Sequence, residues 1–257
     1  MLKLKKLPTL LLLTFIFVTI TSLSYAGLDD KSLVLYLSFD EGAGNTAKDG
    51  SEYGHDGELM KGPKWVDGKS GKAIEFDGTK SQYVIVPIND TLQLREQFSV
   101  VFWVKRGDTQ IRAWNYMVAG GSLKWAVIFN KDNQKTFVYT NGGGWGLRGQ
   151  TDGTQPEDWV HITLTHDTKS AVNIYYDGKK AGGGGKPPTV AEIDGSVMVG
   201  ARHPGQEFFT GVIDEVYLFD RIITEDEINT IKDGGFTPVK PADKLSTTWG
   251  VIKAKRH

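Results

Sequence analysis

Short stretches of alternating apolar and polar residues run along most of this chain, and such alternation is typical of half-buried β-strands. In residues 98–105 every second side chain is large and apolar, and residues 158–167 repeat the pattern with Val160, Ile162 and Leu164. Glycine, proline and Asp-Gly pairs separate the stretches, as they do between neighbouring strands. The pattern predicts about a dozen short strands.

Residues 211–219 predict the last strand of the fold. Most side chains there are β-branched or aromatic, so both faces of the strand are largely apolar. Strict alternation places Asp214 on one face with Val212, Val216 and Leu218. A lone carboxylate on an apolar face is costly unless it is paired with a charge or binds a metal ion.

A single helix is predicted directly after this strand. Thr224 is followed three positions later by Glu227, which is the spacing of a helix capping box. Gly234 and Gly235 then end a helix of about two turns. Many strands, one short helix and no internal repeat predict an all-β fold, a two-sheet antiparallel jelly-roll sandwich.

Several phrases of the sequence resemble the laminin-G-like, concanavalin A-like family of jelly-roll domains. They are GVIDEVYLFDRIITEDEI at the closing strand and, upstream, SFDEGAGNTAKDGS, GKSGKAIEFDG and YVIVP. The resemblance covers nearly all of residues 33–232 and implies the jelly-roll fold. It does not imply a ligand, because one fold hosts many functions.

The resemblance also implies a metal site. In this family the first and closing strands lie near each other, and many members hold a calcium ion with acidic residues and loop carbonyls. Asp40, which ends the first predicted strand, and Asp214 are therefore expected to bind Ca²⁺, with Asp49 as a third candidate. Calcium prefers such oxygen ligands. A salt bridge from Arg202 or Arg221 to Asp214 is the alternative.

Residues 1–26 have the organisation of a secretory signal peptide. A basic start precedes the apolar run 10–20, and Ser24-Tyr25-Ala26 resembles a cleavage site. The run is too short to span a bilayer comfortably, although an uncleaved anchor is the alternative. We expect a secreted, periplasmic or cell-surface protein that is not integral to the membrane after cleavage, with one domain at 27–235 and a basic tail at 236–257.

Composition narrows the choice of partners. The chain has no cysteine, so its core or a metal must hold the fold without disulfides. It carries 30 Lys and Arg against 31 Asp and Glu, and the signal and the tail hold a disproportionate share of the basic residues. The remaining acidic body argues against nucleic acid and anionic membranes as partners. It is compatible with cations and neutral sugars.

Aromatic residues gather among glycines between positions 114 and 145, where indole rings could stack on sugars. A core role is the alternative, above all for Trp125 and Tyr139. The candidate ligand-binding residues are Trp114, Tyr116, Trp145 and Arg148.

The sequence favours an exported, non-catalytic module that binds carbohydrate. A structural or adhesive domain that binds an extracellular protein is the second class, and a glycoside hydrolase is the third. Jelly-roll glycosidases of the laminarinase type carry Glu-Xaa-Asp-Xaa-Xaa-Glu, whereas the nearest match, residues 192–197, lacks the last carboxylate. The five histidines show no zinc-binding spacing.

Export leads to a direct prediction. Cleavage after Ala26 should leave Gly27 as the first residue of protein recovered outside the cytoplasm, as read by mass spectrometry of the intact chain. Recovery of an intact Met1 terminus in a membrane fraction would instead indicate an uncleaved anchor.

Overall fold

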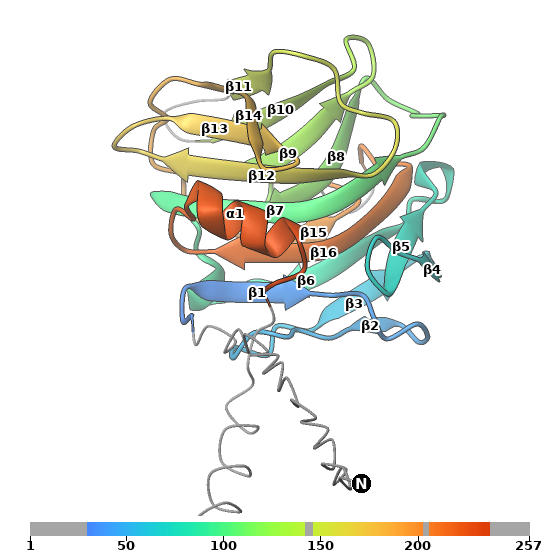
Figure 1. Cartoon of the computed structure of the whole chain (residues 1–257). Helices are drawn as coiled ribbons and strands as arrows, with labels where there is room; N and C mark the ends of the chain where they lie inside the picture. Colours follow the sequence, from blue (N-terminus) through green and yellow to red (C-terminus); the bar gives the residue numbers. More distant parts are fainter. Residues whose placement is uncertain (1–29, 142–145, 203–205, 237–257) are drawn as a thin grey trace, which may run out of the picture.

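In the computed structural model, residues 30–141, 146–202 and 206–236 are described, and they form two antiparallel β-sheets packed face to face (Figure 1). The predicted all-β sandwich with one short helix near its C-terminal end is thereby confirmed. Trp145, the signal segment 1–26 and residues 237–257 of the tail lie outside the described residues.

The strands are hydrogen-bonded along one continuous path. The first sheet contains, in spatial order, β2 (Thr46–Ala47), β3 (Gly57–Met60), β6 (Tyr83–Pro87), β15 (Ser196–Val199), β8 (Trp114–Gly120), β9 (Trp125–Asn130) and β10 (Lys135–Thr140). The path then passes through β11 (Leu147–Thr151) and β14 (Lys179–Gly184). The second sheet contains β13 (Val172–Tyr176), β12 (Val160–Asp167), β7 (Gln97–Arg106), β16 (Gly211–Phe219), β5 (Lys72–Phe76) and β4 (Lys64–Asp67), with β1 (Leu33–Leu37) also on β16.

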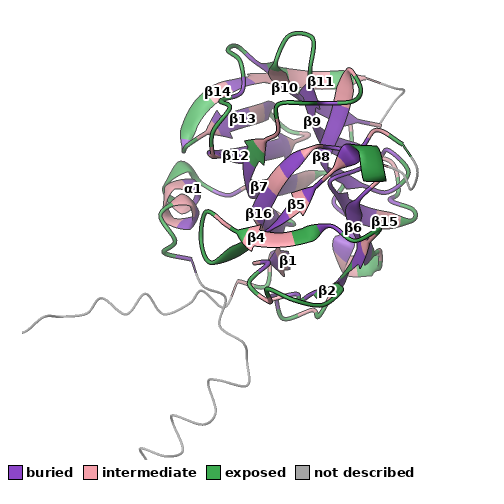
Figure 2. Cartoon of the chain, turned by 90° about the vertical axis from the view of Figure 1, so that its right-hand side faces the viewer, coloured by how far each residue is buried: buried purple, intermediate pink, exposed green. Residues whose placement is uncertain are grey.

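The main core lies between the two sheets. In β7 the alternate residues Phe98, Val100, Phe102 and Val104 all face it and are fully buried, as the alternation predicts. Trp125 lies in the same core. Each such side chain contributes about 1.5–3 kcal/mol through its burial, so the core stabilises the fold without disulfides. Figure 2 shows that burial follows the strands, while the loops are largely exposed.

The helix α1 (Glu225–Lys232) covers the outer face of the second sheet (Figure 1). Its buried residues Ile228 and Ile231 pack in a cluster with Tyr217 and Phe219 of β16. Phe236, which we placed in the tail, packs edge-on against these two rings, with centroids 5.9 and 5.8 Å away. The packed domain therefore extends at least one residue past the predicted boundary at 235.

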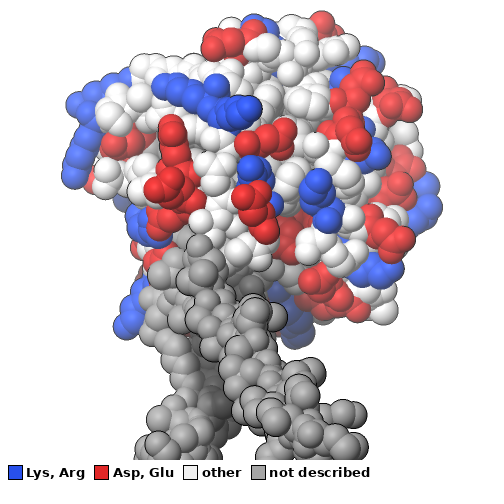
Figure 3. Space-filling model, in the orientation of Figure 1, with Lys and Arg blue, Asp and Glu red and all other residues white. Residues whose placement is uncertain are grey.

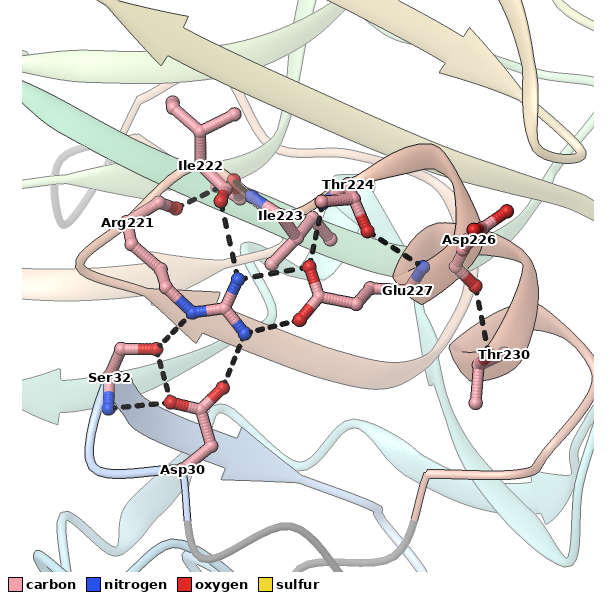
Figure 4. Close-up of polar contacts among 10 residues, drawn as sticks. Asp30, Ser32, Arg221, Ile222, Ile223, Thr224, Asp226, Glu227 and Thr230 are labelled. Atoms are coloured by element: carbon pink, nitrogen blue, oxygen red, sulfur yellow. Dashed lines mark hydrogen bonds and ion pairs between the residues drawn. The ribbon is translucent and has the colours of Figure 1, made fainter.

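A polar cluster fixes the start of α1 (Figure 4). The predicted capping box is present, because Glu227 N donates to Thr224 Oγ1 at 3.2 Å and Thr224 N donates to Glu227 Oε2 at 2.7 Å. Arg221 Nη2 lies 2.6 Å from both Glu227 Oε1 and Asp30 Oδ2, while its Nε donates to Ser32 Oγ at 2.8 Å. One guanidinium therefore joins the helix to the segment that leads into β1.

The predicted alternation of the closing strand is wrong in its middle. The pairing of β16 with β7 shifts register between Asp214 and Tyr217, and Glu215 has a φ of 54°. This β-bulge changes which side chains face the core. Ile213 lies in the core together with Val216, whereas the alternation placed them on opposite faces. Asp214 is paired with Trp103 of β7 and lies on the opposite side of the strand from this core.

His161 of β12 is buried under the outer layer of the second sheet. Only 1% of it is exposed, neither ring nitrogen has a hydrogen-bond partner, and its ring meets Trp103 edge-on at 5.1 Å. Burial lowers its pKa to about 3; the charge of Lys232 acts in the same direction and that of Asp233 in the opposite one. Unfolding exposes this imidazole to water and restores its ordinary pKa, so it takes up a proton below about pH 6.5.

The free energy of unfolding should therefore decrease as the pH is lowered. Stability from neutral His161 is fully present above the unfolded pKa and is lost as pH falls from 6.5 towards 3. Between pH 7.5 and 5.5, His161→Gln should lose about 1.4 kcal/mol less stability than the parent chain in urea titrations. Parallel stability curves for the two proteins would contradict the buried neutral state.

Candidate functional site

The first sheet has an outer face that is also apolar. Across β8, β9 and β10 and the turn between β8 and β9 it carries a buried cluster of Tyr116, Ala119, Leu123, Ala126, Ile128, Phe137 and Tyr139, with Trp114 at the border. A second cluster holds Tyr83, Met198, Ala201 and Phe208. Met198 of β15 is paired with Ala119 of β8, so the two clusters share one face, which we call the outer aromatic face.

Three of the predicted ligand-binding residues lie on or near this face. Trp114 is half-buried and meets Phe137 edge-on at 5.1 Å, and Tyr116 is buried two positions further along the same strand. Arg148 is half-buried on β11. Burial raises the pKa of Tyr139, and the nearby charge of Arg148 acts in the opposite direction. The alternative that Trp125 fills the core agrees with its complete burial.

A groove of about 690 Å³ opens beside the outer aromatic face, where three loops meet. Ile111, which is 42% exposed, gives it an apolar wall, and polar side chains surround this wall. The residues that form the groove are Gly78, Thr79, Ser81, Ile111, Arg112, Gln206, Glu207 and Phe208.

The groove is fixed to the sheet by two contacts. The Glu207 carboxylate lies 2.7 Å from Arg202 Nε, and the Arg202 guanidinium lies 5.6 Å from the centre of the Tyr116 ring. Phe208 stacks on Tyr83 with centroids 6.3 Å apart. None of the groove residues is among the four candidate ligand-binding residues of the sequence analysis. They come from three separate segments of the chain, at 78–81, 111–112 and 206–208, and no local pattern connects them.

The candidate metal ligand Asp214 is completely buried. Its Oδ2 accepts hydrogen bonds from the backbone N–H groups of Lys69 at 2.8 Å and Ser70 at 3.1 Å, whereas its buried Oδ1 has no hydrogen-bond partner. Burial raises the pKa of Asp214 to about 7, helped by the charges of Glu215 and Asp40 and opposed by the two hydrogen bonds. A buried, half-satisfied carboxylate of this kind suits a cation.

Asp40 lies against the same loop as Asp214. Its Oδ1 accepts a hydrogen bond from Lys72 N at 2.8 Å. A Cβ on Gly71 would collide with the Asp40 carboxylate, and one on Gly68 would come within 2.6 Å of Asp214 Oδ2. The structure therefore brings these two predicted ligands together around the turn between β4 and β5, which only glycine permits at those positions.

The third candidate, Asp49, has a different environment. Its Oδ1 accepts hydrogen bonds from the N–H groups of Tyr36 and Ser51, and its Oδ2 accepts from the Ser51 hydroxyl and His55 N. These four bonds, of 2.6 to 2.9 Å, organise the loop after β2. Within the described residues no three His, Asp or Glu side chains converge as metal ligands, so a site here would combine two carboxylates with carbonyl oxygens.

A family profile described as the concanavalin A-like lectin/glucanases superfamily matches residues 77–229. The chain belongs to this superfamily. The resemblance seen in the sequence is thereby confirmed. Among curated proteins no sequence matches the chain.

Solved structures show the same fold at low identity. Domain 4 of the extracellular GH43 arabinanase AbnA from Geobacillus stearothermophilus, solved with arabinotriose, has 22% identity and a TM-score of 0.64, with 78% of this chain and 98% of that domain covered. The binding domain of Paraclostridial mosquitocidal protein 1 has 15% identity and a TM-score of 0.64, and the alignment covers 79% of this chain and 52% of that one. The binding domain of botulinum neurotoxin DC, solved with SialylT, has 14% identity and a TM-score of 0.61, and the alignment covers 79% of this chain and 51% of that one.

The alignments therefore differ in extent. The chain matches the arabinanase domain over its whole length but spans about half the length of the two toxin domains. Such identities establish a common fold and leave the ligand open. Over the described ranges, no helix has the length and apolar character needed to cross a membrane.

Proposed function

We propose that this superfamily member is an exported, non-catalytic module that binds carbohydrate in the groove beside the outer aromatic face, and that its fold holds one calcium ion. The observation that carries the proposal is the composition of the groove. An exposed aliphatic side chain, Ile111, lies beside the hydrogen-bonding groups of Thr79, Arg112 and Gln206.

This combination suits a sugar ring. One face of such a ring is apolar and its rim carries hydroxyl groups, so a good site pairs apolar contact with a few oriented polar groups. Ile111 offers the apolar contact, and Arg112 and Gln206 offer donors and an acceptor. Glu207 both lines the groove and holds Arg202 over Tyr116, so the buried rings of the outer aromatic face support the groove from below.

The structural relatives support this ligand class. One was solved with arabinotriose and another with SialylT, and a botulinum neurotoxin type C structure concerns interaction with two ganglioside molecules. Ligands of this class are thus named for some of the proteins that share this fold while differing widely in sequence.

The acidic groups of the groove support a binding role over hydrolysis. Glycoside hydrolysis needs two carboxyl groups about 5–10 Å apart across the scissile bond. Of the described residues that line the groove, Glu207 alone carries a carboxylate, and that group is paired with Arg202. In the partial laminarinase-type match, Asp194 is engaged by Ser122 N at 3.0 Å and by Lys124.

A protein partner is the second candidate. Ile111 and Leu147, at 42% and 47%, are the large hydrophobic side chains with high exposure in the described part of the chain. An adhesive contact would use such side chains with little need for Arg112, which distinguishes it from sugar binding.

Calcium would supply the positively charged partner that the buried Asp214 carboxylate lacks. Its Oδ1 and the nearby Asp40 carboxylate would hold the ion together with backbone carbonyls, and the ion would neutralise both acids. Asp214 belongs to β16, Asp40 follows β1, and both bind the turn between β4 and β5. The ion would therefore pin three segments of the second sheet together.

If the groove binds sugar, removing the Arg112 side chain should weaken glycan binding. Arg112→Ala should weaken binding of the glycan identified on an array by about tenfold, because one charged hydrogen bond contributes about 1.5 kcal/mol. Titration calorimetry measures the change, with Lys179→Ala, an exposed lysine of β14, as the control. If Arg112→Ala binds glycan as tightly as the parent chain while Ile111→Ser abolishes capture of an extracellular protein, the adhesive alternative is correct.

Calcium binding predicts a change in thermal stability. Saturation at 100 times the dissociation constant should stabilise the protein by about 2.7 kcal/mol, seen as a rise in melting temperature that a chelator reverses. Asp214→Asn and Asp40→Asn should lose this response, and magnesium should substitute poorly because it requires tight octahedral geometry.

Asp49→Asn is the matched control for the calcium experiment. It should lower the melting temperature, because it disturbs four hydrogen bonds, yet keep the full calcium response. Chelated and calcium-loaded parent protein melting at the same temperature would exclude the ion.

A further inference from the structure

A second groove, of about 430 Å³, lies on the outer side of the second sheet at the C-terminal end of α1. It is separate from the first groove and shares none of its residues. Its volume falls in the range of small-ligand pockets. The side chains that matter for its chemistry are Tyr36, Asp40, Lys69, Trp103, Glu215 and Tyr217.

The groove contains an oriented carboxylate. The hydroxyls of Tyr36 and Tyr217 donate to the same oxygen, Glu215 Oε2, at 2.8 and 2.6 Å, and their rings are stacked with centroids 4.3 Å apart. The bulge at Glu215 directs its carboxylate towards the hydroxyl ends of the two stacked rings. No described residue donates to Oε1, so one lone-pair-bearing oxygen of a fixed carboxylate remains for a ligand.

An aromatic face in the same groove already holds a cation. Lys69 Nζ lies 4.5 Å from the centre of the Trp103 ring, in the geometry of a cation–π contact. The buried His161 meets the same Trp103 ring edge-on and helps to hold it in place. Lys69 is exposed and forms no ion pair with the described residues, so a ligand ammonium could take its place at low cost.

The charges around the groove also favour a cation. With the charge of Asp40 assigned to the calcium site, Glu215 and Asp233 are the acids that remain along the groove, and of its two lysines Lys232 is paired with Asp233 at 3.3 Å. The C-terminus of α1 adds partial negative charge. Figure 3 shows acidic and basic side chains mixed over this side of the molecule, so the preference is local to the groove and not a property of the whole face.

We propose that this groove binds a sugar with a free amino group. The ligand ammonium would displace the Lys69 side chain from the Trp103 face and pair with Glu215 Oε1, and ring hydroxyls would donate to Asp40. A neutral or N-acetylated sugar would leave the Glu215 carboxylate without its charged partner. A bare lysine side chain would leave Asp40 unused, so the site recognises ring and ammonium together.

The test uses three probes: a glucosamine tetramer with protonated amines, its fully N-acetylated form, and a tetralysine peptide. Titration calorimetry should detect the glucosamine tetramer, with the other two at least tenfold weaker. Glu215→Gln should weaken it about tenfold because the charge is lost, whereas Glu58→Gln, an exposed acid of β3, should have no effect. Equal binding of the acetylated tetramer or of tetralysine would overturn the proposal.

Lys69→Met gives an independent readout if Glu215→Gln fails to fold. It removes the competing ammonium without touching the Glu215 hydrogen bonds, so affinity for the glucosamine tetramer should rise several-fold. Unchanged or weaker binding would overturn the assignment. Arg112→Ala separates the two grooves: if it abolishes glucosamine binding, the amino sugar occupies the first groove and the second-groove proposal is wrong, whatever the outcome for the first.

Discussion

The pairing of β16 with β1, β5 and β7 is the interaction on which the rest of the structure depends. One long strand hydrogen-bonds to the first strand of the chain, to the end of the β4–β5 hairpin and to the longest core strand. With no disulfide in the chain, this ladder is what joins its earliest and latest elements. The helix α1 follows from it, since its apolar side covers rings that β16 presents.

The bulge in β16 gives two consecutive acids different tasks. Asp214 lies beneath the loop between β4 and β5 and is completely buried, while Glu215 accepts hydrogen bonds from two tyrosine hydroxyls at the edge of a groove. Burial raises the pKa of both carboxyl groups, and each has one oxygen bonded within the chain and one that a ligand could use. A strand without the bulge would have placed them on opposite faces of an unbroken ladder.

Local patterns in the sequence predicted the elements but not the places where distant elements meet. Alternation located the core face of β7, and the Thr224–Glu227 spacing located α1, because both depend on residues a few positions apart. The bulge was missed because nothing near Glu215 in the sequence announces a positive φ. The first groove could not be predicted because Thr79, Ile111 and Phe208 are brought together only by the fold. The four backbone and hydroxyl donors around Asp49 cannot be seen in a sequence either.

The Arg221 cluster determines how the domain would respond to mechanical load. Asp30 and Phe236, at the two ends of the packed domain, both lie beside the last residues of β16. Tension applied between these ends would therefore peel β1 from β16 one hydrogen bond at a time instead of shearing the whole ladder at once. At the N-terminal end, the bonds from Arg221 to Asp30 and Ser32 would bear that tension first, so one guanidinium holds the end at which β1 would separate from β16.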